Sequence, residues 1–338
     1  MLMSLTPNRP GTLPPSPGVP MAWVVVIVMV VGGSGVALTA ALVGSHPTAT
    51  PGSMTVTDDL GRSVSVPFNP ARVVALGPSI VDLLYQLGLR DRIVGVDCYA
   101  ASDGGLSNDY DPGQIALWDL TSSMCVQVEP EFVPSMLANL TPSLVLASTL
   151  VSLSELSLVT SELGVPFVML QPPTLSGILV DATLVGEIFG VGAQASALNA
   201  RLNSELYNAT NTTANAASLP TVLLTYYAGP SGYYTYGPGT FGESLLELTG
   251  ASSISASATE PYPELTAAQV LAAQPDWIVY GTGFGLSESS YSSGPDWNDF
   301  QAVHSGNVTG IDSNWITEPD PTMILEGIPA LLGVFHPG

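Results

Sequence analysis

The sequence predicts an α/β protein made of two Rossmann-like lobes with mainly parallel sheets, bridged by a single long helix. The clearest sign is a strand–helix–strand pattern shortly after the N-terminal region. Residues 73–76 form a short apolar strand, residues 80–87 carry apolar side chains at helical spacing, and residues 93–96 form a second apolar strand. Two strands with a helix between them make a βαβ unit, which requires a parallel sheet.

A faint internal repeat supports the two lobes. Residues 136–148 and 270–282 each have the order helix end, proline, apolar strand, so each marks the same step in its own lobe. A long helical pattern between them, residues 174–207, is interrupted at 190–192 and predicts the bridge. Ligands of such sheets bind at the carboxyl ends of the strands, so the cleft between the lobes is the expected site.

The expected organisation follows from these elements. We predict, in order, an N-terminal tail (1–21), a membrane anchor or signal (22–43), a tether (44–53), an N-terminal binding lobe (54–173), a bridging helical segment and link (174–217) and a C-terminal binding lobe (218–338).

The N-terminal apolar segment, residues 22–43, carries no charge and is long enough to span a bilayer as one transmembrane helix. A cleaved signal peptide is the competing interpretation. The segment has a poor cleavage pattern and no lipid-acceptor cysteine, which favours an uncleaved single-pass anchor in the cell membrane. Everything after the tether would then be extracellular.

The charge balance excludes several functions. Charged residues make up 10% of the chain, there is no lysine, and the net charge is −22, so the sequence offers no basic patch for nucleic acid. A surface suited to a salty or acidic exterior is the simplest interpretation of this balance. We expect a monomer that binds no nucleic acid.

The catalytic inventory is poor. The chain has no Gly-x-Ser-x-Gly, His-Glu-x-x-His or phosphate-loop motif, and His46, His304 and His336 lie far apart. We therefore predict no catalytic residues, no metal site and no permanently bound cofactor. An exported metal-dependent hydrolase is the weakest of the interpretations considered.

Two features agree with export. Cys98 and Cys125 are the two cysteines, and an even number in an exported chain predicts a disulfide, with free thiols or a metal site as alternatives. Four sequons predict glycosylation, and those in the polar stretch are preferred. The four acceptors, preferred pair first, are Asn208, Asn211, Asn307 and Asn139.

Aromatic residues are the positive signal for binding, because they follow predicted strands where a ligand would lie. Tyrosine and tryptophan offer a flat apolar face and a polar tip, which suits a large ring ligand. Ordinary core packing is the alternative for about half of them. The candidate ligand-binding residues are Tyr99, Tyr226, Tyr227, Tyr233, Tyr234, Phe284 and Trp315, together with Pro78 and Ser79 in the first strand–helix loop.

The order of several short motifs resembles the periplasmic-binding family for ferric siderophores and cobalamin, the substrate-binding component of ABC importers. Thr57-Asp-Asp-Leu-Gly-Arg62 resembles the family's opening hairpin, and Arg72-Val-Val with Pro78-Ser79 resembles its first strand and loop. Leu140-Thr-Pro-Ser-Leu-Val-Leu146 and Leu245-Leu-Glu-Leu-Thr-Gly250 resemble later motifs. The resemblance extends from about residue 54 to about residue 337.

The resemblance also implies residue roles. In cobalamin-binding members a tyrosine after "V-G-V-x-x" faces the ligand, and Tyr99 matches that position, while Trp315 resembles a tryptophan near the family's end. Members present one glutamate per lobe to the permease, but Ser135 and Gly239 occupy those positions here. The neighbouring Glu131 and Glu243 are therefore the candidates for permease docking.

Together these observations predict an extracellular, membrane-anchored substrate-binding protein that delivers its ligand to an ABC permease and ATPase. The scarcity of bases favours cobalamin or a near-neutral ferric siderophore over an anionic chelate. The alternative is a cell-surface adhesion or structural domain that keeps the fold without a transported ligand.

Overall fold

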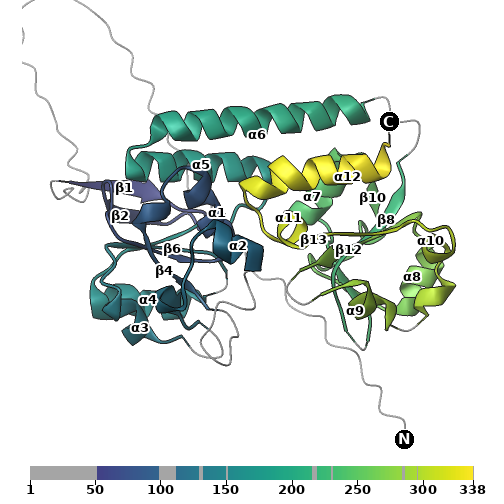
Figure 1. Ribbon diagram of the computed structural model, residues 1–338, viewed down its shortest axis with the longest axis horizontal. Helices are drawn as coiled ribbons and strands as arrows, with labels where there is room; N and C mark the ends of the chain where they lie inside the picture. Colours follow the sequence, from purple (N-terminus) through teal and green to yellow (C-terminus); the bar gives the residue numbers. More distant parts are fainter. Residues whose placement is uncertain are drawn as a thin grey trace, which may run out of the picture. The chain divides into compact units, whose positions relative to one another are not determined.

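The computed structural model describes residues 52–98, 112–128, 132–149, 151–214, 219–229, 231–283, 286–294 and 296–337 (Figure 1). These residues belong to one compact unit, Thr48–Gly338. The predicted anchor and the candidate residues Tyr99, Glu131 and Phe284 lie outside the described residues. Within the described ranges, no helix is long and apolar enough to cross a membrane.

The first element is a hairpin of β1 (Ser53–Thr57) and β2 (Ser63–Pro67), paired antiparallel. Asp58 closes its turn, because its carboxylate accepts hydrogen bonds from the backbone N–H of Leu60 and Arg62 and forms an ion pair with the Arg62 guanidinium. The same carboxylate accepts the N–H of Met169, 3.2 Å away. The hairpin is thereby fixed to the first lobe with its tip beside the end of β7.

The first lobe holds a five-stranded sheet in the order β5-β4-β3-β6-β7, with every pair parallel. All residues of β3 and β6 are buried, because helices cover both faces of the sheet. The strand order reverses between β3 and β6, so the loops after these two strands diverge and leave room for a ligand. The strands are β3 (Val73–Leu76), β4 (Ile93–Asp97), β5 (Cys125–Val126), β6 (Leu144–Ala147) and β7 (Phe167–Met169), and the helices are α1 (Pro78–Gln86), α2 (Pro112–Leu117), α3 (Pro134–Asn139) and α4 (Leu153–Leu163).

The predicted helical segment is divided into two helices, and the second, longer one joins the lobes. α5 (Leu175–Phe189) ends at Gly190, whose φ of 68° turns the chain back, and α6 (Gly192–Thr213) then runs alongside α5 (Figure 1). The Asn199 side chain joins the two helices by donating to the Leu179 carbonyl and to the Thr183 hydroxyl, each at 2.9 Å. The interruption at 190–192 is visible in the sequence, but the reversal of direction depends on the left-handed conformation of Gly190.

The second lobe has a mixed sheet in the order β11-β9-β8-β12-β13, with β10 also paired to β8. β8, β10, β12 and β13 run parallel, whereas β9 is antiparallel to both of its neighbours, β8 and β11, so three of the five strand pairs are parallel. The strands are β8 (Thr221–Ala228), β9 (Tyr233–Thr235), β10 (Ser252–Ser253), β11 (Glu264–Leu265), β12 (Trp277–Thr282) and β13 (Val308–Asp312), and the helices are α7 (Phe241–Leu248), α8 (Ala267–Ala273), α9 (Glu288–Ser292) and α10 (Gln301–His304).

The C-terminal segment returns to the first lobe. It runs through α11 (Asn314–Thr317), a π-helical turn (Met323–Gly327) and α12 (Ile328–Phe335), which packs along α6 (Figure 1). Thr322 donates its N–H and its hydroxyl to the buried Asp82 of α1, at 3.2 and 2.9 Å. The two lobes are thus joined both by α6 and by this returning segment.

Candidate ligand-binding cleft

A cleft of about 540 Å³ lies between the two lobes. Loops that follow strands of the first sheet form one wall, aromatic residues of the second lobe form the other, and the returning C-terminal segment forms the floor. The lining residues are Asp59, Leu60, Ser79, Ser148, Thr149, Leu170, Gln171, Pro172 and Pro173 on the first side, Tyr226, Tyr236, Gly239, Thr240, Phe241, Pro261 and Tyr262 on the second, and Thr317, Glu318 and Pro319 on the floor.

The first wall is polar and rigid because it stands on the carboxyl ends of three parallel strands. Ser79 follows β3, Ser148 follows β6 and Pro172 follows β7. Gly77 links β3 to α1 with φ of 136°, and a Cβ there would lie 2.5 Å from the Ser148 hydroxyl, so only glycine fits. The buried Asp97 carboxylate fixes this loop by accepting the Gly77 N–H at 2.7 Å.

The second wall is a cluster of aromatic rings. The ring of Tyr236 is buried, with its hydroxyl donating to the Ile316 carbonyl at 2.8 Å. Around it stand Tyr226, Phe241 and Tyr262, with ring centroids 4.9, 5.4 and 6.1 Å from that of Tyr236. Burial, with the neighbouring Tyr262 and Tyr234, raises the pKa of Tyr226 to about 12, so its hydroxyl stays a hydrogen-bond donor near neutral pH.

The floor carries a carboxylate. Glu318 is partly buried at the N-terminus of α1, where hydrogen bonds from the Ser79 side chain and backbone favour its charged form. Burial, together with the charge of Asp97, outweighs these hydrogen bonds and raises the pKa of Glu318 to about 7. Near neutral pH this side chain therefore changes its charge.

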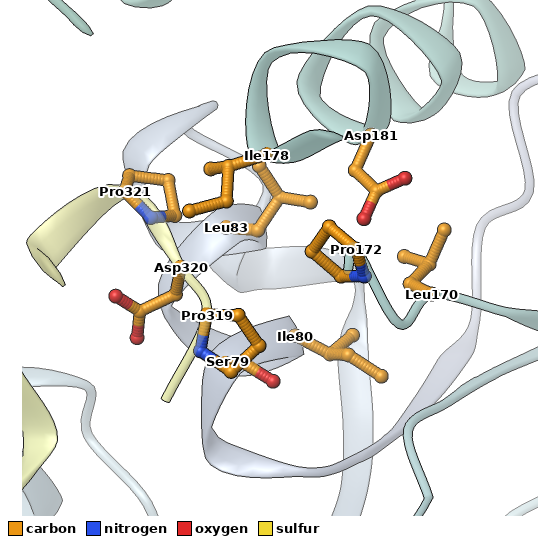
Figure 2. A pocket seen from close by; sticks show the side chains of 10 residues that line it. All are labelled: Ser79, Ile80, Leu83, Leu170, Pro172, Ile178, Asp181, Pro319, Asp320 and Pro321. Atoms are coloured by element: carbon orange, nitrogen blue, oxygen red, sulfur yellow. The ribbon is translucent and has the colours of Figure 1, made fainter. Parts of the chain in front are cut away.

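A second, much smaller cavity of about 10 Å³ adjoins the cleft and shares Ser79, Leu170, Pro172 and Pro319 with it (Figure 2). Asp181 points from α5 toward Pro172 at its edge (Figure 2). Asp181 is buried, and burial, with the nearby Asp59, raises its pKa to about 8. The first wall is thus backed by an acid that is largely protonated near neutral pH.

No arginine of the described chain lines the cleft. Arg62 forms an ion pair with Asp58, and Arg201 lies on α6. The other three donate to backbone carbonyls: Arg72 to those of Leu140 and Thr141, Arg90 to those of Trp118 and Asp119, and Arg92 to the carbonyl of Pro70. Because the chain has no lysine, the cleft lacks a countercharge for an anion among the described residues.

The structure brings some predicted residues to the cleft and excludes others. Tyr226 and Ser79 line it, and Pro78 lies next to Ser79 as the first residue of α1. Tyr227, which neighbours Tyr226 on β8, is 48% exposed and does not line the cleft. Trp315 is partly buried and packs against the hydrophobic core rather than against the cleft.

The expectation that Tyr233 and Tyr234 follow β8 in a loop at the cleft is wrong. Both belong to β9, which pairs with β8, and neither lines the cleft. Tyr233 is fully buried and packs against Trp297 and Phe300, with ring centroids 6.2 and 5.7 Å away. Because β9 is short and lies between two turns, its sequence resembles that of a loop. Its pairing with β8 directs the side chains of Tyr233 and Tyr234 so that neither lines the cleft.

Several lining residues were missed. Asp59, Glu318, Phe241 and Tyr262 were not predicted as site residues, although Tyr262 and Glu318 lie in proline-flanked stretches that suggest exposed, rigid loops. Asp59 lies in the opening hairpin motif, where its position at the cleft depends on the docking of the hairpin to β7.

The remaining predicted residues have identifiable surroundings. Cys98 and Cys125 form a disulfide with Cα atoms 5.2 Å apart, which joins the end of β4 to the start of β5. Glu243 is partly buried in the first turn of α7, and its carboxylate accepts the Gly239 N–H at 3.0 Å. Within the described residues, no group of three His, Cys, Asp or Glu side chains could hold a metal ion.

The four sequon asparagines differ in accessibility. Asn208 and Asn211 are exposed on α6, and Asn139 is exposed at the end of α3. Asn307 is partly buried, and its side chain donates to the Asp276 carbonyl at 3.0 Å.

Comparison with known proteins assigns the family. The model of the periplasmic binding protein family matches residues 73–315, which is well over half of the chain. A cobalamin-binding protein of Halobacterium salinarum is 26% identical over 84% of this chain and 74% of its own length.

Solved structures share the fold. The Fe3+-hydroxamate transport protein of Saccharomonospora viridis superposes with a TM-score of 0.67 at 19% identity, over 84% of this chain and 99% of that protein. The periplasmic vitamin B12-binding protein of Vibrio cholerae gives a TM-score of 0.63 at 20% identity, over 80% of this chain and 98% of that protein. The chain belongs to the periplasmic binding protein family, whose members are the non-enzymatic substrate-binding components of ABC importers.

Proposed function

We propose that this protein captures cobalamin, or a near-neutral ferric hydroxamate, in the cleft between its lobes and delivers it to an ABC permease and its ATPase. The observation that carries the proposal is the pairing of an aromatic wall with a polar wall that has no base among its described residues. Aromatic faces suit the broad apolar surface of a corrinoid or a chelate cage. The cobalamin-binding relative of Halobacterium salinarum supports the same ligand class.

The size of the cleft agrees with a ligand of this kind. A volume of about 540 Å³ lies within the range of about 300–1,000 Å³ that is usual for small-molecule sites. A corrinoid exceeds this volume, so part of it would remain outside the cleft. The joining of the lobes by α6 and by the Thr322–Asp82 contact supports small closure around the ligand rather than a wide hinge motion.

The test is a fluorescence titration of the full chain with cyanocobalamin, haem and a neutral ferric trihydroxamate. Trp297, Trp315 and the cleft tyrosines provide the signal. We expect saturable quenching by cobalamin or the hydroxamate, with a weaker response to haem because its propionates find no base. The absence of a response to all three would favour the alternative, a cell-surface adhesion or structural domain on the same fold.

We further propose that residues 22–43 anchor the protein in the cell membrane, with the binding domain extracellular. A full chain that stays with the membrane fraction after a high-salt wash, beside a chain lacking residues 1–43 that is released, would support this. Recovery of both forms in the soluble fraction would contradict it.

Two smaller proposals concern the surface. Asn208 and Asn211 are the preferred glycosylation sites because both are exposed on one helix, and the double change to Gln should increase the gel mobility of protein made in the native host.

Glu243, with Glu131 as the partner glutamate of the other lobe, is our candidate for permease docking. Glu243→Gln should reduce transport without reducing ligand affinity, and unchanged transport would contradict the docking role.

A further inference from the structure

The cleft carries negative groups on two of its sides. Asp59 lines it from the tip of the β1–β2 hairpin, and Glu318 lines it from the floor. Asp59 is exposed, whereas Glu318 is partly buried. The five described arginines all lie elsewhere, so nothing positive in the described lining balances these carboxylates.

Asp59 is held in place by its surroundings. Its N–H donates to the Met169 carbonyl at 3.2 Å, and its carboxylate accepts the N–H of Gln171. Asp181 lies behind it on α5, 3% exposed, with one carboxylate oxygen that has no hydrogen-bond partner in the described structure. Two carboxyl groups close together, one of them buried, share a proton more readily than they carry two charges.

We propose that the cleft selects its ligand by the charge of the groups at the ligand's periphery. Asp59 and Glu318 accept hydrogen bonds from peripheral amines or primary amides, and ligands with peripheral carboxylates or catecholates are rejected. This inference rests on the proposed function, and it names the ligand chemistry that the same cleft prefers. An ammonium or amide group that reaches either carboxylate donates a hydrogen bond to its free lone pairs. A carboxylate would face Asp59 and Glu318 without a counterion and would lose its hydration.

The selection depends on pH because Glu318 of the cleft floor and Asp181 behind Asp59 titrate near neutrality. Asp59 faces Asp58 and Asp181, while Glu318 faces Asp97 and Asp320, with Ser79 as a hydrogen-bond donor. The pKa of Asp181 is raised to about 8 and that of Glu318 to about 7, in both cases mainly by burial. Raising the pH from about 5.5 to about 8.5 adds negative charge around the cleft, so discrimination against anions should grow.

A matched ligand series isolates the effect of charge. Ferrioxamine B carries a free ammonium group, and its N-acetyl and N-succinyl derivatives keep the same iron cage but are neutral and anionic. Cyanocobalamin and its monocarboxylic acid form a second pair, an amide against a carboxylate. Binding of each to the full chain would be measured by calorimetry at about pH 5.5 and about pH 8.5.

We expect the affinity to decrease from the cationic to the neutral to the anionic cage, and from the amide to the acid. The cation-to-anion ratio should be about tenfold at the higher pH, which corresponds to about 1.4 kcal/mol, and smaller at the lower pH. Asp59→Asn and Glu318→Gln should each reduce this ratio. Asp299→Asn makes the same charge change at an exposed site outside the cleft lining and should leave the ratio unchanged.

The outcomes separate the two proposals. Binding in which the anionic derivative is equal to or tighter than the cationic one would overturn the charge selection and leave the proposed function standing. The charge selection would also be overturned if Asp59→Asn and Glu318→Gln, folded by circular dichroism, keep the wild-type ratio. Failure of both ligand series to bind at either pH would overturn the proposed function together with this inference.

Discussion

The two lobes share strand–helix architecture but differ in chemistry. The first lobe has an all-parallel sheet of aliphatic strands, contains four of the arginines and holds the disulfide. The second lobe has a mixed sheet, contains no arginine or lysine, and gathers Tyr226, Tyr236, Phe241 and Tyr262 at one edge. The difference shows that one fold used twice can supply two unlike walls to a single cleft.

The walls differ because their loops are built differently. In the first lobe, Gly77 and the prolines after β7 fix short backbone turns, which leave carboxylate, hydroxyl and backbone groups at the surface. In the second lobe, the pairing of β8 with β9 brings tyrosines of adjacent strands into tilted ring contact. We therefore expect the first wall to orient a ligand and the second wall to supply most of its contact area.

The largest expected effect concerns the stability of the first lobe. Replacing Cys98 and Cys125 by Ser should lower the free energy of unfolding by about 3–4 kcal/mol, because the disulfide closes a loop whose ends are 27 residues apart. Urea unfolding, followed by circular dichroism, would measure the change. A loss below about 1 kcal/mol would show that packing of β4 against β5, rather than the covalent link, holds this edge.

The second prediction tests the aromatic wall. Tyr226→Ala should lower ligand affinity by about tenfold to a hundredfold, because it removes a central aromatic contact. Tyr227→Ala is the matched control, since its neighbouring side chain is exposed and lies outside the cleft lining. Calorimetric titration of both variants with cyanocobalamin would measure the two affinities. Equal losses of affinity would contradict the assignment of Tyr226 to the aromatic wall.

The third prediction concerns pH and the acids between the lobes. Burial raises the pKa of Asp181 to about 8, that of Glu318 to about 7 and that of Asp82 to about 6, and it raises the pKa of Asp320 well above its usual range. The folded state therefore binds more protons than the unfolded chain from about pH 4 to about pH 8, so stability should increase as pH falls through this window. Each group contributes at most about 1.4 kcal/mol per pH unit.

Thermal unfolding at about pH 6 and about pH 8.5 would measure this dependence. We expect a melting temperature a few degrees higher at the lower pH, and a smaller difference in Asp181→Asn. A melting temperature that rises with pH over this range would contradict the burial of these acids.

The smallest expected effect concerns the hydrogen bond between Thr322 and Asp82, which joins the lobes. Thr322→Val removes the hydroxyl that donates to Asp82 at 2.9 Å, which should cost about 1 kcal/mol of stability. Thr212→Val removes an exposed hydroxyl that donates within α6, to the Asn208 carbonyl at 2.9 Å, and serves as the control. If chemical denaturation gives equal losses of unfolding free energy for the two variants, the contact between Thr322 and Asp82 adds no more stability than an ordinary side-chain hydrogen bond.

Much of the fold was predictable because it depends on local patterns. The strand–helix–strand order after Arg72, the helix break at 190–192 and the motif order that indicates the family are all visible in the sequence. The reversal of α6 along α5 was not, because it depends on the backbone conformation of Gly190.

The site was less predictable because it depends on the direction of side chains. Tyr226 and Tyr227 are equivalent in sequence, and only the pairing of β8 with β9 decides which of them faces the cleft. Glu318 and Asp59 are single acids in unremarkable segments. They reach the cleft because the C-terminal segment returns to α1 and the hairpin docks on β7.

The most direct test of the inter-lobe cleft as the binding site is hydrogen–deuterium exchange of the full chain with and without saturating cyanocobalamin or ferric hydroxamate. Our account predicts that the ligand slows exchange on both walls at once, in peptides containing residues 59–62 and 170–173 of the first lobe and residues 226–241 of the second. Protection confined to one lobe, or located on the outer groove of α5 around Val180, would contradict it.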